Sequence, residues 1–327
     1  MRVAINGFGR IGRQVFKAGF HEPGFSVVAI NDLVDIETLA YLLKYDSVYG
    51  IWDEPVRVQG NTLIVGRKKI QVYAEKDPSK LPWEVLQIDT VVESTGVFKT
   101  TESASLHIQA GAKRVVITAP AKDDTETVVI GANEHRMKFL SHGVLSNASC
   151  TTNATAPLFT ALEPLGVQKA MLSTIHSYTA SQSMVDSPQK DLRRGRAGAI
   201  NIIPTSTGAA EATAKTLPAL KGKFDGIAIR VPVVTGSLID LTILTKAKTT
   251  VEEVNDLLVL ASKSKRLQGV LTTTTAPIVS TDIIGDPHSA IADLSMTRVV
   301  GGNLVKVVAW YDNEWGYSNR IVDLTLS

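Results

Sequence analysis

The sequence of 327 residues predicts a protein of two domains, an α/β domain followed by an α+β domain. The length alone corresponds to about two domains of ~150 residues each. In the first half, short apolar runs typical of strands alternate with helical patterns, which indicates a parallel sheet covered by helices on both faces. After about Ser149, longer strand-like runs and separate helices replace this alternation. That pattern is typical of a domain built on a mixed or antiparallel sheet.

The expected elements of the first half follow from the spacing of apolar residues. Ile11, Val15 and Ala18 share one face of a helix, and a short apolar run precedes them. Two β-type runs flank a glycine and predict a hairpin at residues 62–65 and 69–73. Further strands are expected at residues 2–6, 26–31, 89–93, 114–118 and 127–130, and helices at residues 10–19, 36–45 and 102–110.

The second half contains one long segment with little apolar periodicity, residues 177–203, which carries Pro188 and three arginines. Structureless segments of this length in a compact chain are usually functional. Helices are expected at residues 149–165, 205–217 and 251–262, and strands at residues 169–176, 226–231, 237–244 and 304–310.

Composition and charge exclude several classes of protein. The 34 basic and 32 acidic residues leave a net charge of +2, and 44% of the residues are hydrophobic. These values exclude a disordered chain and give no electrostatic footprint for a dedicated nucleic-acid partner. The one cysteine, Cys150, rules out an intrachain disulfide and a zinc site built on cysteines. Five histidines are scattered without the spacing of metal ligands, so no metal is expected. They are His21, His107, His135, His142 and His288.

The sequence shows no pattern typical of a secretory signal or of a membrane span. The first apolar run breaks at Gly7, short of the ~7–15 residues of a secretory signal. No stretch reaches the ~18 continuous apolar residues of a membrane span. We therefore expect a cytoplasmic protein without a membrane partner.

A glycine motif and an acid indicate a dinucleotide site. Gly7, Gly9 and Gly12 fit G-x-G-x-x-G, directly after a predicted strand and at the start of a predicted helix. Asp32 follows Gly12 by 20 residues, at the end of the second strand, where a carboxylate can hold a ribose 2′-hydroxyl. Its charge would repel a 2′-phosphate, so the motif predicts a Rossmann domain that prefers NAD to NADP. The alternative is a plain glycine turn with an aspartate that caps the next helix.

Cys150 lies near the start of a predicted helix, within a run of small polar residues. A helix N-terminus lowers the pKa of a thiol, and small neighbours leave the sulfur accessible. His176 ends the next predicted strand, where it could pair with the thiol as a base. From spacing alone, catalysis is balanced against a buried, inert cysteine and a hydrogen-bonded core histidine.

Anion-binding candidates lie in loops or at the ends of elements. They are Thr179, Arg194, Thr207 and Arg230. Residues 205–208 begin a predicted helix, so their hydroxyls and N–H groups could bind a phosphate. Taken from the residues alone, ordinary helix capping explains residues 205–208 better, and the arginines of residues 193–196 could equally form a solvated face or a subunit contact.

These motifs together resemble the phosphorylating glyceraldehyde-3-phosphate dehydrogenase family over essentially the whole chain. The segments that carry the resemblance are INGFGRIGR at residues 5–13, SNASCTTN at 146–153, HSYT at 176–179, KDLRRGR at 190–196, STGAA at 206–210, RVP at 230–232 and WYDNEWGYSNR at 310–320. The second and the last of these are highly specific, whereas the first alone is not.

The resemblance implies a homotetrameric enzyme that oxidises D-glyceraldehyde 3-phosphate with inorganic phosphate and NAD, giving 1,3-bisphosphoglycerate and NADH. It implies a Rossmann domain over residues 1–149 and a catalytic domain over residues 150–313. The C-terminal helix, residues 314–327, would pack back onto the first domain. Residues 177–203 match the family's S-shaped loop, which lies against a neighbouring subunit's cofactor.

The resemblance also implies a role for each matching residue. Cys150 would be the nucleophile that carries a thioester, and His176 the general base. The residues implied for the cofactor are Gly7, Gly9, Arg10, Ile11, Gly12, Asp32, Lys76, Thr95, Thr118, Asn313 and Tyr317. The residues implied for the two phosphate groups are Ser149, Thr151, Thr179, Arg194, Thr207, Gly208 and Arg230.

Departures from the family pattern and competing interpretations qualify this picture. Ala154 stands where many relatives carry a second cysteine, and Ser187 leaves some use of NADP open. Erythrose-4-phosphate dehydrogenase shares the Cys–His pair, but HSYT and STGAA favour the phosphorylating enzyme. A semialdehyde dehydrogenase or acyl-phosphate reductase has a similar architecture, and the match at residues 310–320 argues against it. A cofactor-binding or RNA-binding protein without catalysis is the remaining alternative.

Overall fold

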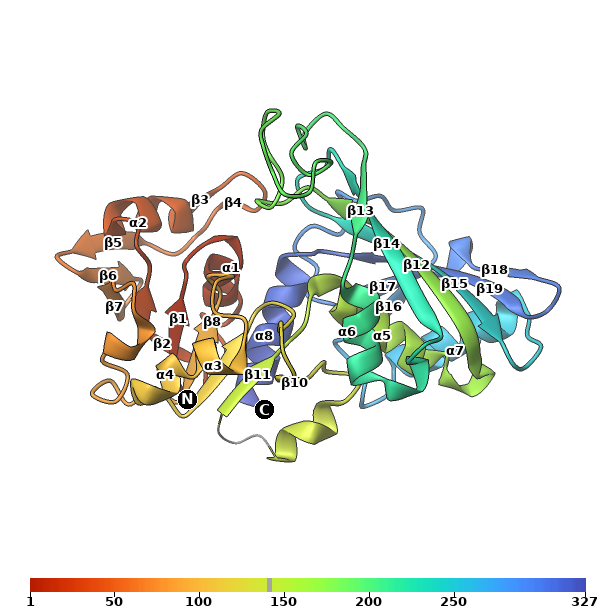
Figure 1. Cartoon of the computed structure of the whole chain (residues 1–327), viewed down its shortest axis with the longest axis horizontal. Helices are drawn as coiled ribbons and strands as arrows, with labels where there is room; N and C mark the ends of the chain where they lie inside the picture. The colour runs from red at the N-terminus through yellow and green to blue at the C-terminus, as the bar shows by residue number, and fades with distance from the viewer. Residues whose placement is uncertain (140–142) are drawn as a thin grey trace. The chain divides into compact units, whose positions relative to one another are not determined.

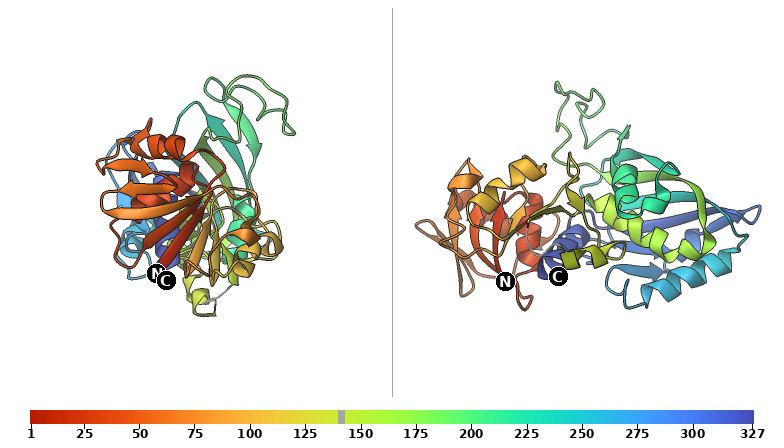
Figure 2. Two further views of the ribbon diagram at one scale, coloured as in Figure 1. Left: turned by 90° about the vertical axis from the view of Figure 1, so that its left-hand side faces the viewer. Right: turned by 60° about the horizontal axis from the view of Figure 1, so that its bottom comes forward.

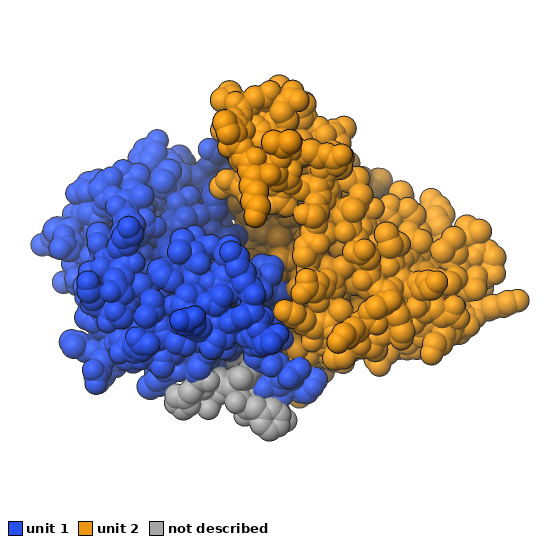
Figure 3. Space-filling view, in the orientation of Figure 1, with its two compact units in different colours: residues 1–128, 135–148, 318–327 blue, residues 129–134, 149–317 orange. Residues whose placement is uncertain are grey.

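The computed structural model describes residues 1–139 and 143–327, the side chains of residues 137–139 excepted. It divides into two compact units (Figure 3). Unit 1 comprises residues 1–128, 135–148 and 318–327, and unit 2 comprises residues 129–134 and 149–317. His142, one of the scattered histidines, lies outside the described residues.

Unit 1 is built on a nine-stranded sheet in the order β10-β11-β9-β8-β1-β2-β7-β6-β5. The strands are β1 (Arg2–Asn6), β2 (Ser26–Asn31), β5 (Val56–Gln59), β6 (Thr62–Val65), β7 (Lys68–Tyr73), β8 (Thr90–Glu93), β9 (Arg114–Ile117), β10 (Glu126–Thr127) and β11 (Gly143–Ser146). From β10 to β7 all neighbours are parallel, and β5, β6 and β7 form an antiparallel edge. The strands fan out with the twist typical of open parallel sheets (Figure 2, left).

The order of these strands creates a switch point beside β1. The chain runs from β1 to β2 and β7 on one side, and then returns to β8, β9 and β11 on the other side. In open α/β sheets, ligands bind at the carboxyl ends of the strands where the order reverses. The strands β1, β8 and β9 are almost wholly buried, as expected for a sheet covered on both faces.

Short helices and connections complete unit 1 (Figure 1). They are α1 (Arg10–Ala18), α2 (Ile36–Lys44), α3 (Thr101–Ala104), α4 (Leu106–Gln109), η1 (Pro78–Lys80) and η2 (Glu134–Phe139), with a small pair of strands β3 (Tyr45–Asp46) and β4 (Gly50–Ile51). Helix α8 (Trp315–Leu326) belongs to unit 1 from Ser318 onwards. There the side chain of Arg114, at the start of β9, donates a hydrogen bond to the carbonyl of Thr325.

Unit 2 is built on a mixed eight-stranded sheet in the order β13-β14-β12-β15-β19-β17-β16, with β18 paired to β19. The strands are β12 (Val167–Ser177), β13 (Ile203–Ser206), β14 (Phe224–Val231), β15 (Ser237–Thr245), β16 (Leu271–Thr274), β17 (Ala290–Asp293), β18 (Arg298–Val300) and β19 (Leu304–Tyr311). β12 is parallel to β14 and β16 to β17, and the other pairs are antiparallel.

One face of this sheet carries the helices of unit 2 and its core. The helices are α5 (Cys150–Ala161), α6 (Ala209–Thr216) and α7 (Val251–Ser262), with single turns η3 (Glu163–Leu165), η4 (Pro218–Leu220) and η5 (Leu294–Met296). In β15 every second residue is buried, and Ile239, Leu241 and Ile243 pack in one cluster with Leu158 of α5 and Leu258 of α7. This alternation is what a sheet with one covered face requires. The expected fold class is therefore confirmed.

Several expected elements differ in the structure. The strand expected at residues 127–130 is wrong beyond Thr127, because the chain turns and the N–H groups of Ala132 and Asn133 bond back to the carbonyl of Val129. The helix expected at residues 102–110 is two short helices, α3 and α4. The helix expected from residue 205 begins only at Ala209, because residues 203–206 pair with β14 instead. Tertiary pairing overrides local helix propensity there.

Local sequence did not reveal the shortest strands. The missed strands are β3, β4, β5, β11, β13, β16, β17 and β18. All of them have only two to four residues, too few for a period-2 pattern to stand out. The long segment after β12 does lack helix and strand, from residue 178 to residue 202 (Figure 1).

Candidate active site

The glycine turn of unit 1 joins the end of β1 to the start of α1. Gly7 has φ +88°, and a Cβ there would lie 2.6 Å from the backbone nitrogen of Thr95. A Cβ at Gly12 would lie 2.2 Å from the carbonyl oxygen of Gly7, so both positions exclude any side chain. Gly9 differs, because nothing lies within 4 Å of its Cβ position. The turn is therefore tightly packed behind Gly9 and open in front of it, as backbone approach to a pyrophosphate requires.

The residue that caps α1 has no side chain. Gly9 is the N-cap of α1 and makes no side-chain capping bond, so the cap leaves room for an anion at this helix N-terminus. Arg10, in the first turn, bonds through Nη1 to the buried carboxylate of Asp46 at 2.8 Å. Ile11 is half-buried beside it. The residues present thus fit the phosphate groups of a dinucleotide.

Asp32 lies next to the glycine turn, directly after β2. Its carboxylate accepts hydrogen bonds from the N–H of Phe8 at 2.6 Å and of Val34 at 3.0 Å. It does not cap α2, since the N-cap of that helix is Asp35, which accepts from the N–H of Thr38. The alternative of a capping role for Asp32 is therefore wrong. A half-buried carboxylate at this position has the chemistry to accept hydrogen bonds from ribose hydroxyls.

The other residues expected around the cofactor lie at or near the same edge of the sheet. Thr95 follows β8, and its N–H and hydroxyl both bond to the carboxylate of Glu93. Thr118 follows β9, and its N–H and hydroxyl both bond to the carbonyl of Glu93. Lys76 is exposed in the loop after β7. The carboxyl ends of parallel strands thus bring together residues that are far apart in the sequence.

In unit 2, the reactive pair forms where α5 begins. Ser149 is the N-cap of α5, and its hydroxyl accepts from the N–H of Thr152. Cys150 is the first residue of the helix, and its Sγ lies 3.4 Å from Nε2 of His176. His176 is the second-last residue of β12 and is almost fully buried. The pair predicted from spacing is therefore formed.

Hydrogen bonds at the other ring nitrogen bear on the role of His176. Nδ1 lies 2.7 Å from the carbonyl oxygen of Ser177, which only accepts, and 2.7 Å from Nη1 of Arg230, which only donates. Arg230 also donates to the same carbonyl at 3.0 Å. When Nδ1–H donates to Ser177, Nε2 presents a lone pair to the thiol, as a general base must.

The electrostatic environment keeps both groups of the pair neutral. Burial, followed by the positive charge of Arg230, lowers the pKa of His176 to about 3. Burial raises the pKa of the Cys150 thiol, and the charge of Arg230 acts in the opposite direction. The expectation that the helix N-terminus leaves this thiol with a lowered pKa is thus wrong. The N–H groups of Cys150 and Thr151 do lower it, but burial outweighs them.

A tyrosine that the sequence reasoning did not single out supports the pair. The hydroxyl of Tyr311 lies 2.9 Å from those of Thr151 and Thr174, which joins β19 to α5 and β12. Its ring meets the imidazole of His176 edge-on, with centroids 6.0 Å apart. Burial raises the pKa of Tyr311, so the hydroxyl remains protonated. The available signal was its place in the specific segment at residues 310–320.

Asn313 and Tyr317 are both buried close to the pair. Oδ1 of Asn313 accepts from the hydroxyls of Ser177 at 2.9 Å and Ser237 at 2.8 Å, which fixes its amide group. Burial raises the pKa of Tyr317, and the charge of an ionised Cys150 would raise it further. Tyr317 therefore shares the electrostatic environment of the thiol, and Asn313 is fixed next to the strand end that carries His176.

Two arginines of unit 2, Arg230 and Arg194, bring positive charge close enough to affect His176. Arg230 pairs with His176 across strands β14 and β12, and its buried Nε has no hydrogen-bond partner among the described residues. Arg194 donates through Nε to the hydroxyl of Thr205 at 3.1 Å and through Nη2 to the carbonyl of Ser206 at 3.1 Å. Its charge also lowers the pKa of His176. An orphaned guanidinium donor beside the pair fits a bound anion.

The remaining phosphate candidates occupy turns. Thr179 shares a hydrogen bond with Ser181 at 2.9 Å. The hydroxyl of Thr207 accepts from the N–H of Ala209 at 3.2 Å, and Gly208 is the N-cap of α6 without a side-chain capping bond. Helix capping by residues 205 and 206 is excluded, because both residues lie in β13.

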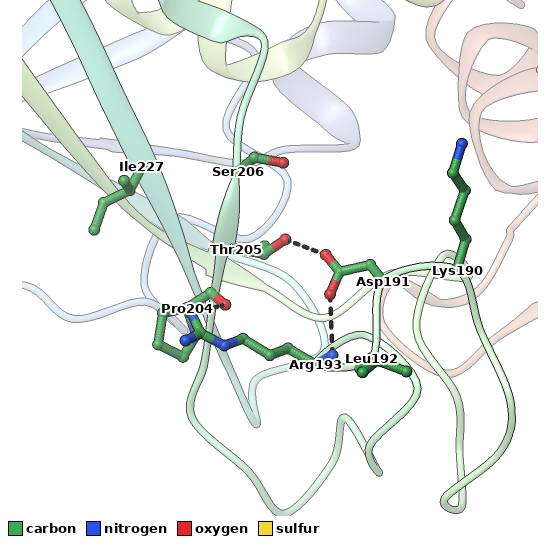
Figure 4. A pocket seen from close by; sticks show the side chains of 8 residues that line it. All are labelled: Lys190, Asp191, Leu192, Arg193, Pro204, Thr205, Ser206 and Ile227. Atoms are coloured by element: carbon green, nitrogen blue, oxygen red, sulfur yellow. Dashed lines mark hydrogen bonds between the residues drawn. The ribbon is translucent and has the colours of Figure 1, made fainter.

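A surface pocket of about 670 Å³ lies on unit 2 next to Arg194, which bonds two of the residues that line it (Figure 4). It is lined by Lys190, Asp191, Leu192, Arg193, Pro204, Thr205, Ser206 and Ile227. Asp191 accepts from the hydroxyl of Thr205 and the N–H of Arg193, while Lys190 extends away from the other side chains (Figure 4). The pocket contains neither member of the reactive pair.

Neither a metal-binding cluster nor a membrane-spanning helix occurs among the described residues. Groups of three or more His, Cys, Asp or Glu side chains that could hold a metal ion are absent from this part of the chain. Among the same residues, no helix combines the length and apolar character needed to cross a membrane.

A glycine turn fitted to a dinucleotide in unit 1 and a paired thiol and imidazole in unit 2 are together typical of an NAD-dependent oxidoreductase. Residues 1–101 match the family model described as glyceraldehyde 3-phosphate dehydrogenase, NAD binding domain. Residues 149–313 match the model of the C-terminal domain of the same enzyme. The chain therefore belongs to the glyceraldehyde-3-phosphate dehydrogenase family, and NAD is its cofactor.

Curated relatives extend over nearly the whole chain. The glyceraldehyde-3-phosphate dehydrogenase of Thermotoga maritima is 56% identical over 325 residues, covering 98% of this chain and 97% of the relative. That of Geobacillus stearothermophilus is 51% identical, covering 99% and 97%. Glyceraldehyde-3-phosphate dehydrogenase 2 of Streptomyces avermitilis is also 51% identical, covering 100% and 98%.

Proposed function

We propose that this chain catalyses the phosphorylating oxidation of D-glyceraldehyde 3-phosphate, a step of glycolysis and gluconeogenesis. The aldehyde, inorganic phosphate and NAD give 1,3-bisphosphoglycerate and NADH. The observation that carries this proposal is the 3.4 Å distance between Cys150 Sγ and His176 Nε2 at the N-terminus of α5, in a member of this family. A thiol paired with a neutral imidazole is the arrangement that covalent catalysis on an aldehyde requires.

In the first half of the reaction, Cys150 forms a thioester. His176 accepts the thiol proton at Nε2 as Sγ bonds to the aldehyde carbon, and the proton then passes to the aldehyde oxygen to give a hemithioacetal. The N–H of Cys150, at the start of α5, stabilises the charge on that oxygen. His176 next accepts the hydroxyl proton as a hydride leaves the carbon. NAD, when bound, supplies the acceptor for that hydride.

In the second half, inorganic phosphate attacks the carbonyl carbon of the thioester. The C–S bond breaks, 1,3-bisphosphoglycerate leaves, Sγ takes the proton back from His176, and the proton of the attacking hydrogen phosphate is released to water. The two anions, substrate phosphate and attacking phosphate, must both be held for this displacement. Thr179 and Arg230 would bind the phosphate of the substrate, and the unpaired Nε of Arg230 supports this. Ser149, Thr151, Thr207 and Gly208 would bind inorganic phosphate, with Arg194 lining this region.

The cofactor would be held mainly by the carboxyl edge of the unit 1 sheet. Gly7, Gly9, Gly12, Arg10 and Ile11 would bind its phosphates, and Asp32 the adenosine ribose. Lys76 would lie near the adenine. Thr95 and Thr118 would lie near the rest of the dinucleotide, and Asn313 and Tyr317 would contact the nicotinamide. Because Asp32 carries a negative charge, NAD should give a higher kcat/KM than NADP.

We further propose that the enzyme is a cytoplasmic homotetramer. Its NAD-binding domain would span residues 1–149 and its catalytic domain residues 150–313, with helix 314–327 packed onto the first. The stretch at residues 177–203 would lie against a neighbouring subunit's cofactor. The exposed apolar side chains of Leu192 and Ile200 in this stretch support an interface there.

One assay tests the proposed reaction. NADH formation is followed with glyceraldehyde 3-phosphate or erythrose 4-phosphate, each with and without inorganic phosphate, and with NAD or NADP. We expect turnover that depends on phosphate and prefers the triose phosphate and NAD. Phosphate-independent turnover, or a preference for erythrose 4-phosphate, would indicate the sister enzyme instead. Cys150→Ser should abolish turnover, and full activity of that variant would refute the thioester mechanism.

A further inference from the structure

Three neighbouring strands of unit 1 end in buried polar residues that lie in one row. Asn6 ends β1, Asn31 ends β2 and Glu93 ends β8. In the sheet, Asn6 is in register with both Asn31 and Glu93. All three side chains are at most 4% exposed. Buried polar groups at this edge, directly behind the residues proposed to hold the dinucleotide, call for an explanation.

Glu93 is at the centre of a network of hydrogen-bond donors. One carboxylate oxygen accepts from Nδ2 of Asn6 at 2.5 Å and lies 3.2 Å from Nε2 of His107. The other oxygen accepts from the N–H and the hydroxyl of Thr95. No Lys or Arg pairs with Glu93 among the described residues, so these donors alone compensate the buried charge.

The neighbour of His107 fixes which way its ring donates. The indole N–H of Trp83 lies 2.9 Å from Nδ1 of His107, and an indole nitrogen can only donate. Nδ1 must therefore accept, which puts the ring proton on Nε2, facing Glu93. His107 and Trp83 are both fully buried. The tautomer and hence the charge-assisted bond to Glu93 are set by packing far from solvent.

The network reaches the loops after β1, β7 and β8. Asn6 directly precedes the glycine turn, and its Oδ1 accepts from Asn31 at 2.7 Å. Asn31 in turn bonds the backbone N–H and carbonyl of Glu75, both at 2.8 Å, next to Lys76. On the other side, Glu93 holds the backbone of Thr95, which is in van der Waals contact with Gly7.

We propose that Glu93, oriented by His107 and Trp83, is a positioning residue for the dinucleotide. It holds the glycine turn and the Thr95 turn in fixed register from behind and does not touch the ligand itself. This inference rests on the proposed dinucleotide site. If this is correct, a change at Glu93 should weaken NAD binding more than a change at an equally buried residue of β8 that lowers the Tm.

Glu93→Gln is the sharpest test, because glutamine has the same shape as glutamate but carries an NH2 donor in place of one acceptor oxygen. Every partner of the carboxylate is a donor, so the amide nitrogen must face donors in either orientation. The matched control is Thr90→Val, at the opposite end of β8. Thr90 is equally buried and accepts a hydrogen bond from Arg114, but it lies three residues from the binding edge.

The measurements are the Kd of NAD for the cofactor-stripped protein, KM for NAD, kcat at saturating NAD, and the Tm. We expect Glu93→Gln to raise Kd and KM about tenfold, the effect of one unpaired buried donor, while kcat changes less than about twofold. Thr90→Val should lower the Tm but leave Kd unchanged. A wild-type Kd in Glu93→Gln would overturn the proposal and leave the network a purely structural role.

Trp83→Phe provides a second test if Glu93→Gln does not fold. It removes the N–H that fixes the tautomer of His107, so Kd should rise about threefold, the effect of one neutral hydrogen bond. An unchanged Kd in this variant would refute the inference. If the wild-type protein itself failed to bind NAD, the proposed function would fail, which is a separate and recognisable outcome.

Discussion

Arg230 holds Nη1 of its guanidinium 2.7 Å from Nδ1 of His176, and the same nitrogen donates to the carbonyl of Ser177 at 3.0 Å. One half-buried cation therefore acts on both members of the reactive pair. It lowers the pKa of His176, and it opposes the burial that raises the pKa of Cys150. The arginine proposed to bind the substrate phosphate thus also favours a neutral base and an ionised thiol.

Replacement of this cation should make the thiol less reactive before any substrate binds. In Arg230→Met the pKa of Cys150 should rise, because the charge that lowers it is gone. We expect a roughly three- to tenfold lower thiolate fraction at neutral pH. The rate of alkylation by iodoacetamide at pH 7, in the absence of aldehyde and phosphate, measures this directly.

Arg196→Met is the control for that experiment. Arg196 lies in the same long segment as Arg194 and pairs with the exposed Asp186, so its loss should leave the alkylation rate unchanged. An unchanged rate in Arg230→Met would contradict the electrostatic role of Arg230. An equal decrease in both variants would point to a general effect of removing positive charge from unit 2, and not to the contact between Arg230 and the reactive pair.

His176 should make the fold sensitive to acid. Its pKa is about 3 in the folded chain and near 6.5 in the unfolded chain, so the unfolded state takes up a proton that the folded state refuses. Stability is therefore full above about pH 6.5 and is lost as the pH falls toward 3, with a cost of about 2 kcal/mol at pH 5. His176→Asn, which cannot titrate, should lose less stability between pH 7.5 and pH 5.

The denaturation midpoint in guanidinium chloride, compared at these two pH values, checks this prediction. For each protein, the midpoint at pH 5 is subtracted from the midpoint at pH 7.5. Comparing these two differences removes the effect that the substitution has at neutral pH, and also the contribution of the carboxylates that both proteins share. Equal losses in the wild type and in His176→Asn would show that the histidine is not held neutral by burial.

The fold class was predictable because the longer strands show the two-residue alternation of buried side chains and the longer helices show the 3.6-residue repeat. Strand β15 alternates over nine residues, and helix α7 begins and ends at the expected residues. The helix expected from residue 205 was wrong over its first four residues, because Thr205 pairs with Ala228 of β14. Pairing between residues so far apart in the sequence cannot be predicted from a local pattern. The same limit applies to the two-residue strands β3 and β4.

The candidate site was predictable where a residue acts through its type and its place in a motif. Cys150 and His176 are 26 residues apart. Spacing alone allowed either a catalytic pair or an inert cysteine and a core histidine, and only the family resemblance favoured the pair. The direction of the thiol pKa was wrong because burial depends on the whole domain, whereas the helix N-terminus is visible locally. Glu93 and Tyr311 act through buried partners that no local pattern reveals.

The glycine turn allows stability and binding to be separated. Gly9→Ala adds a methyl group into open space at a backbone conformation that alanine adopts, so the Tm should stay within about 2 °C of the wild type. The methyl group occupies the surface that a pyrophosphate must approach, so NAD should bind more weakly. Gly12→Ala should instead destabilise unit 1 by about 1–3 kcal/mol, because its Cβ would overlap the carbonyl of Gly7.

Thermal melts and NAD titrations of the two variants check this pair of predictions. Full NAD affinity in Gly9→Ala would show that the ligand does not approach this glycine. A wild-type Tm in Gly12→Ala would show that the helix and the turn are less closely packed than the structure indicates.

The single cysteine should make the enzyme vulnerable to peroxide. Cys150 is only partly buried, and the chain contains no second thiol that could trap its sulfenic acid as a disulfide. Peroxide should therefore drive Cys150 to sulfinic and sulfonic acids, and activity should not return unless an external thiol is present during the exposure. Mass spectrometry of the peptide that contains Cys150, together with the activity recovered after treatment with dithiothreitol, measures both effects.

Ala154→Cys offers the matched comparison, since residue 154 lies one helical turn after Cys150 in α5, within the span that a disulfide can bridge. That variant should recover part of its activity on later reduction, whereas full recovery of the wild type without any added thiol would contradict the prediction.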